Sequence, residues 1–132
     1  MLTIVFCEIC FYYINIKRCI NIPTEFTLNV IHIIKSIPTG KVLTYGFIAK
    51  LAGNPRAARQ VSWILHSSSK KYHLPWHRVI SSNGSLSMKS IEDRQYQKRL
   101  LELEEITFLD GFKINLEKYI WKPKSSELVK LP

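Results

Sequence analysis

The spacing of apolar residues predicts a helix that begins near Glu25 and ends before Pro38. Its apolar positions, three or four residues apart, are Phe26, Val30, Ile34 and Ile37. Such spacing gives a helix one buried face. Thr24 is a candidate N-cap, and proline cannot continue a helix.

Two more helices are predicted directly after it. Thr44 is a second candidate N-cap, for a helix over 45–52 that Gly53 ends by allowing a left-handed residue. Asn54 as N-cap and Pro55 at the first helical position predict the start of a third helix. Its core-facing positions are Ala58, Val61 and Leu65. Two helices joined by so short a turn form a helix-turn-helix.

The next segment carries loop and strand patterns. Residues 67–71, Ser-Ser-Ser-Lys-Lys, predict a polar basic loop, and residues 77–80 predict a strand. Asn83–Gly84 is the dipeptide typical of a type I′ hairpin turn. A hairpin that follows a helix-turn-helix is a wing.

A last long helix is predicted over 92–105, followed by a second hairpin. The core stripe expected for that helix is Tyr96, Leu100 and Leu103. Strands over 106–109 and 112–116, joined by Asp110–Gly111, form the hairpin, and the aromatic segment 119–123 is expected to pack on the domain. The pattern predicts a mainly α fold with small β hairpins, of the winged helix-turn-helix class.

Length and composition divide the chain into one domain and two flanks. The chain has 132 residues, of which 46% are apolar. This length and apolar content are typical of about one domain. We place that domain at 23–124, an N-terminal extension at 1–22 and a C-terminal tail at 125–132. Polar residues interrupt the apolar extension, so we expect no membrane span and no membrane partner. The extension is either a genuine element or the product of a start codon placed too far upstream.

The three cysteines, all in the extension, bear on metal binding and redox state. They are Cys7, Cys10 and Cys19. Cys7 and Cys10 have metal-like spacing, but a tetrahedral zinc site needs a second ligand pair, so we expect no metal and no cofactor. An odd cysteine count without a secretory pattern favours a reducing compartment. This would be the cytoplasm of a bacterium, in association with the nucleoid, or the nucleus of a eukaryote.

Charge is the strongest indication of a partner. The chain has 19 Lys and Arg against 10 Asp and Glu, a net charge of +9, and no acid lies between Phe26 and Ile91. A field of one sign attracts polyanions, so DNA or RNA is the leading partner and a merely solvated basic face is the alternative. The absence of acids over so long a span favours binding. With this charge, we predict that the winged helix-turn-helix fold is a DNA-binding domain.

The third predicted helix presents a surface suited to nucleic acid. Opposite its core-facing positions lie Arg56, Arg59, Gln60 and Trp63. Arginines neutralise phosphates, and a long one can enter a groove or the base stack. A solvated amphipathic face is again the alternative.

The stretch from Leu74 to Gly84 contains unusual chemistry. Trp76 stands between a proline and the pair His77–Arg78. A cysteine there would be a nucleophile with a base beside it, whereas the indole N–H is only a donor. An aromatic wall beside a basic helix suits a base flipped out of a duplex, which stacks on the ring.

In five ordered segments the chain resembles the O6-alkylguanine-DNA alkyltransferase family. The segments are Ile-Pro-Thr-Gly-Lys-Val-Leu-Thr-Tyr-Gly at 37–46, Ile-Ala at 48–49, Ala-Gly-Asn-Pro at 52–55, Ala-Arg-Gln-Val at 58–61 and Pro-Trp-His-Arg-Val-Ile at 75–80. The family reads Pro-Cys-His-Arg in the last segment. Tryptophan at the cysteine position marks its non-enzymatic branch, the alkyltransferase-like proteins. The resemblance covers 26–123 and implies that the chain is not an enzyme.

The resemblance implies a role for each matching residue. The lesion pocket would comprise Trp76, Tyr45, His77, Val79 and Lys89. DNA contacts would come from Thr44, Arg56, Ala58, Arg59, Gln60, Ser62 and Arg78. Tyr45 would crowd the phosphate of the damaged nucleotide, Arg59 would fill the gap in the duplex, and the Val79 backbone would read the guanine edge. His77 and Glu104 would be the remnant of the relay that activates the cysteine.

Four positions depart from the family pattern. Lys89 stands where relatives have arginine, and lysine stacks less well than a guanidinium. Ser62 replaces a glycine beside the groove, and its neighbour Trp63 is unusually bulky. Glu105 replaces the glycine that ends the last helix, so no left-handed stop is expected there.

The implied function is that of a DNA-damage sensor. It would bind O6-alkylguanine in the minor groove of double-stranded DNA and flip it into the Trp76 pocket without alkyl transfer. Acting as a monomer, it would hand the lesion to nucleotide excision repair proteins. Two alternatives belong to other classes: an active alkyltransferase that uses another cysteine, and a sequence-specific helix-turn-helix regulator.

Overall fold

The computed structural model describes residues 23–124. The N-terminal extension, with all three cysteines, and the C-terminal tail lie outside the described residues. The elements are α2 (Glu25–Ser36), β1 (Leu43–Thr44), α3 (Tyr45–Leu51), α4 (Ala58–Tyr72), the 3-10 turn η1 (Trp76–Arg78), β2 (Val79–Ile80), α5 (Ile91–Leu103), β3 (Phe108–Asp110), β4 (Lys113–Ile114) and α6 (Leu116–Tyr119).

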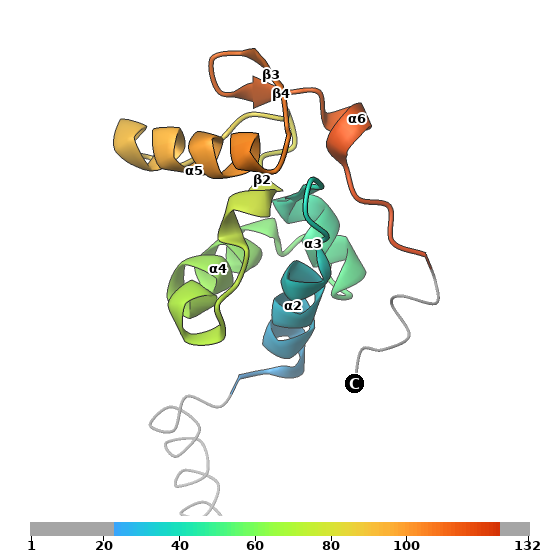
Figure 1. Ribbon diagram of the computed structural model, residues 1–132. Helices are drawn as coiled ribbons and strands as arrows, with labels where there is room; N and C mark the ends of the chain where they lie inside the picture. The colour runs from blue at the N-terminus through green and yellow to red at the C-terminus, as the bar shows by residue number, and fades with distance from the viewer. Residues whose placement is uncertain (1–22, 125–132) are drawn as a thin grey trace, which may run out of the picture.

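The elements form two layers joined by the parallel pair β1–β2. Helices α2, α3 and α4 pack together in the lower layer of Figure 1, and α5 lies above them with the β3–β4 hairpin. Each layer has its own hydrophobic core. The lower core contains Val30, Ile34, Ile48 and Val61, and the upper core contains Val42, Ile80, Leu101 and Ile114. The mainly α fold with small sheets is confirmed.

The two threonine N-caps form as predicted. The Thr24 side chain accepts a hydrogen bond from the Thr27 N–H at 3.2 Å, and the Thr44 side chain accepts one from the Phe47 N–H at 3.2 Å. Each bond satisfies a backbone donor that a helix start leaves unpaired. Gly53 follows α3 with φ +103°, as its predicted role in ending the helix requires.

Helix α4 begins later than predicted. Asn54 is not its N-cap, because its Oδ1 accepts from the Arg56 N–H at 3.2 Å and its carbonyl accepts from the Ala57 N–H at 3.1 Å. The asparagine thus closes a turn of its own, which competes with a helix start at Pro55. The helix starts at Ala58, and Ala57 takes the buried position that was predicted for Ala58.

The predicted basic loop over 67–71 is in fact the last part of α4. Serine usually competes with helix formation by bonding to nearby backbone. Here Ser67 and Ser69 donate their hydroxyls to carbonyls three and four residues earlier in the same helix. The helix therefore continues to His73, which closes it in a left-handed conformation with φ +51°. This extension adds more than one turn to the surface of α4.

The predicted wing hairpin does not form at Asn83–Gly84. A turn is present, closed by the Gly84 N–H that donates to the Ser81 carbonyl at 3.0 Å, but Asn83 lacks the positive φ of a type I′ turn. Strand β2 pairs instead with β1, and the first half of the strand predicted over 77–80 is η1. Both residues of β2 are buried, one in each core, and a strand covered on both faces is typical of parallel pairing.

Helix α5 forms close to its predicted bounds but buries a different face. Tyr96 is 54% exposed and Leu103 is 77% exposed, Leu100 is half-buried, and Gln97 and Leu101 are buried. The Gln97 amide donates to two carbonyls in the η1–β2 segment, both at 3.1 Å. These bonds satisfy the two donors of the buried Nε2, whereas the Gln97 Oε1 has no partner among the described residues. The core stripe predicted from apolar periodicity was therefore wrong by one residue.

A left-handed cap ends α5, contrary to the expectation for Glu105. This residue has φ +66°, and its N–H donates to the Glu102 carbonyl at 3.0 Å. The Ile106 N–H donates to the Leu101 carbonyl at 3.1 Å, which completes a Schellman motif. Ile106 and Leu101 both belong to the upper core, and such a hydrophobic pair commonly accompanies this motif.

Replacing Glu105 with glycine is expected to raise the free energy of unfolding by about 1 kcal/mol, because only glycine adopts a left-handed φ without a steric cost. The same substitution at Glu102, inside α5, is expected to lower it by about 1 kcal/mol. Urea denaturation of both variants measures the two effects. A destabilising Glu105→Gly substitution would contradict the strain assigned to this cap.

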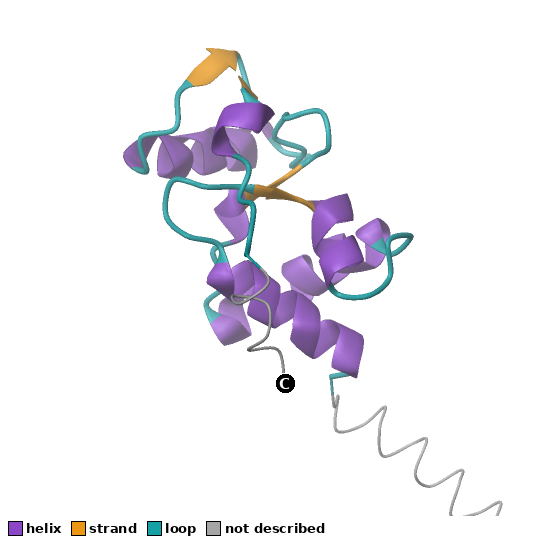
Figure 2. Cartoon of the chain, turned by 90° about the vertical axis from the view of Figure 1, so that its right-hand side faces the viewer, coloured by secondary structure: helices purple, strands orange, loops and turns teal. Residues whose placement is uncertain are grey.

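The second hairpin and the aromatic segment form, but the strands are shorter than predicted and Asp110 ends β3 instead of lying in the turn. Strand β3 pairs with β4 in antiparallel register with a bulge, and the short helix α6, which was not predicted, follows it. The Val42 N–H donates to the Tyr119 carbonyl, and the Trp121 N–H donates to the Val42 carbonyl, both at 2.9 Å. Segment 119–123 is thereby attached to the region of the parallel pair, which lies between the layers in Figure 2.

Membrane spans and metal sites can be assessed only within the described residues. Within residues 23–124, no helix is long and apolar enough to cross a membrane. The same residues contain no group of three or more His, Cys, Asp or Glu that could hold a metal ion. The cysteine pair considered for a metal lies outside this range.

Candidate nucleic-acid interface

A long open groove of about 1590 Å³ runs along α4. Its walls come from α4 and the turn before it, from the start of α3, from η1, from the loop before α5 and from α5 itself. The predicted site residues that line it are Tyr45, Arg56, Arg59, Gln60, Ser62, Trp76 and Lys89. The fold thus brings residues from four separate segments onto one surface.

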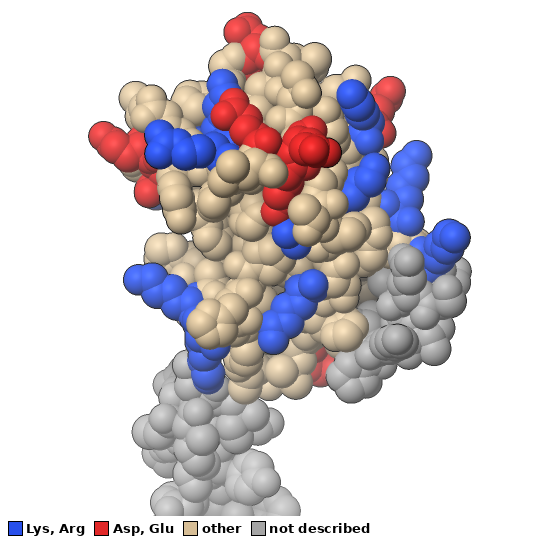
Figure 3. All heavy atoms as spheres, viewed as in Figure 1, with Lys and Arg blue, Asp and Glu red and all other residues tan. Residues whose placement is uncertain are grey.

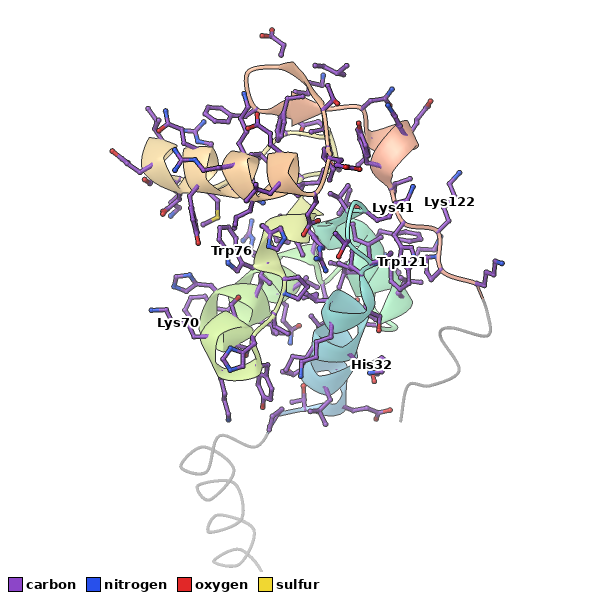
Figure 4. All side chains as sticks on the ribbon, in the orientation of Figure 1. His32, Lys41, Lys70, Trp76, Trp121 and Lys122 are labelled. Atoms are coloured by element: carbon purple, nitrogen blue, oxygen red, sulfur yellow. The ribbon has the colours of Figure 1, made fainter. Side chains whose placement is uncertain are left out.

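Trp76 forms the part of the wall where the two layers meet (Figure 4). The left-handed His73 and the buried Leu74 lead the chain out of α4 and into η1. The indole packs against the lower core, and its centroid lies 6.0 Å from that of the Tyr96 ring, at an interplanar angle of 33°. The His77 ring meets it edge-on at 6.2 Å. These rings offer a nucleobase an apolar planar surface.

Tyr45 enters the groove from the first position of α3. It is half-buried against the lower core, which holds the ring beside the groove. The preceding Thr44 is 7% exposed, and its hydroxyl caps α3. The geometry therefore gives Thr44 the role of positioning Tyr45, and it leaves little of the Thr44 side chain for the predicted DNA contact.

The groove is cationic. Its bases are Arg56, Arg59, Lys70 and Lys89, and its acid is Asp93. Figure 3 shows the acidic side chains mainly over the upper layer and basic ones over α4. A surface of this charge complements the phosphates of a duplex. Ala58, a predicted DNA contact, is half-buried and does not line the groove.

His77 and Arg78, directly after Trp76, both contact the carboxylate of Glu104. The His77 Nε2 lies 2.7 Å from the Glu104 Oε1, and the Arg78 Nη2 donates to the same oxygen at 2.7 Å. The Gly40 N–H donates to the Glu104 Oε2 at 3.1 Å. Burial by itself would raise the pKa of Glu104, but the hydrogen bonds from Arg78, His77 and Gly40 outweigh it and lower that pKa to about 2.

Arg78 belongs to this network rather than to the groove surface. Its Nη1 donates to the Ile37 carbonyl at 2.9 Å, and its Nη2 also donates to the Thr39 Oγ1 at 3.1 Å. The side chain is 16% exposed, and most of its donors are already used. Arg78 therefore ties the turn before β1 to the end of α5, and its predicted DNA contact finds no support in this geometry.

His77 and Val79, the other predicted pocket residues, lie behind the groove wall. His77 contacts Glu104, the partner that the remnant of a relay implies. Val79 is buried, its N–H donates to the Trp76 carbonyl, and its own carbonyl accepts from the Gln97 amide. Val79 does not line the groove, and the reading of a guanine edge by its backbone stays a prediction.

Tyr96 and Met88 line the groove but were missing from the predicted site. Apolar periodicity assigned Tyr96 to the buried face of α5. The pattern could not show which face is buried, because the residue that is buried instead, Gln97, is polar. Met88 comes from the loop before α5, next to Lys89, and the resemblance indicated Lys89 alone in this loop. The packing of α5 beside η1 places Tyr96 next to Trp76, and the loop before α5 brings Met88 to the same groove.

Comparison with known proteins identifies the family. Residues 25–106 match the family described as 6-O-methylguanine DNA methyltransferase, DNA binding domain. The chain is 43% identical over 104 residues to Alkyltransferase-like protein 1 of Schizosaccharomyces pombe, across 75% of this chain and 96% of the relative. It is 44% identical over 99 residues to a DNA base-flipping protein of Vibrio parahaemolyticus, across 75% of this chain and 98% of the relative.

A solved structure shares the fold. The crystal structure of S. pombe Atl1 in complex with damaged DNA containing O6-carboxymethylguanine matches with a TM-score of 0.69 and 40% identity, over 77% of this chain and 100% of that chain. The matched relatives are thus covered almost completely, and Trp76 stands where the transferases have their acceptor cysteine. The chain therefore belongs to the alkyltransferase-like proteins of the 6-O-methylguanine DNA methyltransferase family.

Proposed function

We propose that this protein binds O6-alkylguanine in duplex DNA, flips it into the Trp76 pocket and leaves the alkyl group in place. The proposal rests on Trp76, which stands at the position of the acceptor cysteine and forms part of the wall of a cationic groove. Residues 23–124 contain no cysteine, so the groove offers no thiolate to an alkyl group. The complex of S. pombe Atl1 with damaged DNA supports this class of lesion.

Arg59 and Tyr45 supply the side chains that flipping needs. A base that leaves the stack creates a gap, and a long side chain inserted from the minor groove fills it. Arg59 is exposed at the start of α4, and no acid within 23–124 forms an ion pair with it. Tyr45 approaches from α3 and crowds the phosphate of the flipped nucleotide. The base then stacks on Trp76, which contributes about 1–3 kcal/mol.

The protein presents the bound lesion to nucleotide excision repair as a monomer. A lesion that is bound but not dealkylated needs another activity to remove it. Excision of a segment of the damaged strand suits this need, because it does not depend on the nature of the alkyl group. The resemblance to the non-enzymatic branch of the family supports this step.

Titration of matched duplexes tests the proposal. We expect binding to a duplex with one O6-methylguanine to be at least about tenfold tighter than to the same plain duplex, because stacking on Trp76 is gained only with a flipped base. Both titrations need the same salt concentration, since phosphate contacts dominate non-specific affinity. Quenching of tryptophan fluorescence provides the signal. Trp76→Ala is expected to lose the preference while it retains binding to plain DNA.

Mass spectrometry of the intact protein separates the rival functions. After incubation with the methylated duplex, we expect the protein mass to be unchanged. A gain of one methyl group would identify an active alkyltransferase. Tighter binding to one undamaged sequence than to alkylated DNA would identify a sequence-specific regulator.

A further inference from the structure

We propose that Trp63 is a second minor-groove contact of α4, one helical turn beyond Arg59, which touches damaged and plain duplexes alike. The inference rests on the DNA-binding function proposed above. It adds to the lesion pocket a separate surface that strengthens binding without regard to damage.

Trp63 lies on a continuous stripe along α4. The α4 stripe consists of Arg59, Trp63, His66 and Lys70. These positions are four, three and four residues apart, a spacing that puts them on one face of a helix. All are exposed, and all line the same groove. Lys70 belongs to the stripe only because α4 continues through 67–71, and Figure 4 shows it on the outer side of the helix.

The exposure of Trp63 is unusual for its side chain. Its exposed fraction is 71%, although tryptophan has a large apolar surface to bury. It is outside both hydrophobic cores, and the ring that it meets is His66, with centroids 6.4 Å apart and tilted by 34°. An apolar ring that projects from a basic face is suited to contact with the sugars and base edges of a minor groove.

The rise of the helix locates Trp63 on the duplex. Trp63 is four positions after Arg59, which is about 6 Å along α4. Base pairs stack about 3.4 Å apart, so Trp63 meets the duplex about two base pairs from the gap that Arg59 fills. The bases there are still paired. The ring therefore contacts sugars and base edges that are present in every duplex, and its contribution does not depend on the lesion.

Charge identifies duplex DNA as the occupant of this surface. Helix α4 carries no acid, and Arg56 and Lys70 line the groove near its two ends. A strand of phosphates that follows α4 meets a cation on either side of Trp63. The apolar ring is thereby held against the sugars between neutralised phosphates.

Trp63→Ala and Trp63→Phe test the inference on the plain and the O6-methylguanine duplex, with anisotropy of labelled DNA as the readout. We expect Trp63→Ala to weaken binding to both by about tenfold and by equal factors, and Trp63→Phe to retain most of the affinity. Lys70→Ala should reduce the slope of log K against log salt by about one, whereas Trp63→Ala should leave the slope unchanged. Leu109→Ala is the control, because Leu109 is 65% exposed but lies on β3, outside the groove.

Unchanged affinity of Trp63→Ala for both duplexes would overturn the inference. A loss confined to the methylated duplex would overturn it too, since Trp63 would then belong to the lesion pocket. Failure of the wild-type protein to prefer methylated DNA would contradict the proposed function instead, and the comparison on plain DNA would still decide the role of Trp63. Circular dichroism checks that the variants fold, which is expected because the side chain is exposed.

Discussion

Replacing Glu104 with glutamine is expected to lower the free energy of unfolding by about 3 kcal/mol at neutral pH. The Glu104 side chain is 11% exposed, and its carboxylate binds Arg78, His77 and the Gly40 N–H at once. Glutamine would leave the Arg78 guanidinium without a counter-charge in a partly dehydrated site. Removing one member of such a pair costs more than the pair contributes, because the other charge stays in place.

The same carboxylate makes stability depend on pH. The pKa of Glu104 is lowered from 4.5 to about 2 in the folded protein. A carboxyl group with a depressed folded pKa contributes stability that is complete above its unfolded pKa and is lost as the pH falls through the folded pKa. The wild-type protein therefore loses this contribution between about pH 4.5 and pH 2. With an allowance for solvent screening, the loss is about 2 kcal/mol.

Urea denaturation over a series of pH values, from neutral to acid, measures both effects. The difference in stability between wild type and Glu104→Gln is expected to shrink as the pH falls. Glu102→Gln is the matched control, since this acid is exposed on the same helix and should change stability by less than about 0.5 kcal/mol. A difference that stays constant with pH would show that the charge of Glu104 is not what stabilises the network.

Arg59→Ala is expected to weaken binding to the O6-methylguanine duplex by about 30-fold or more, because an unfilled gap leaves the unstacking of the base uncompensated. Arg59 is exposed in the groove that also contains Trp76 and Tyr45. Binding to the plain duplex should fall less, since only a phosphate contact is lost there. This selective loss distinguishes Arg59 from Trp63, whose removal should weaken both complexes equally.

A matched arginine controls for charge. Arg99 is exposed on α5 and does not line the groove, so Arg99→Ala removes the same charge from another place. Titrations at equal salt compare the two variants, and 2-aminopurine next to the lesion reports the opening of the stack. Equal losses in Arg59→Ala and Arg99→Ala would refute the role of Arg59 as the residue that fills the gap.

Several elements could be predicted because they depend on neighbouring residues. Thr24 and Thr44 each cap a helix by bonding to an N–H three positions later. Gly111, with φ +51°, lies in the turn between β3 and β4, which is also a local property of the chain. The corrected elements depend on distant partners instead. Gln97 is buried because η1 and β2 supply acceptors for its amide, and no local pattern contains that information.

Glu105 shows tertiary structure overriding local preference. Its side chain disfavours a left-handed conformation, yet the upper core buries Leu101 and Ile106 on either side of the turn and so imposes the cap. The strand pairing expected for the wing hairpin was wrong for a related reason, because β2 is buried on both faces and pairs with β1.

The sequence alone determined the chemistry of this protein. Trp76 in place of a cysteine excludes a thiolate at that position, and the acid-free middle of the chain makes the domain cationic; both are properties of the residues themselves. Only the tertiary structure decided which side chains reach the groove. It turned Arg78 inward to Glu104, brought Tyr96 beside Trp76 and extended α4 so that Lys70 joins Trp63 on one face. Exposure and hydrogen-bond partners depend on which distant segments pack together, and so they are decided only when the two layers fold against each other.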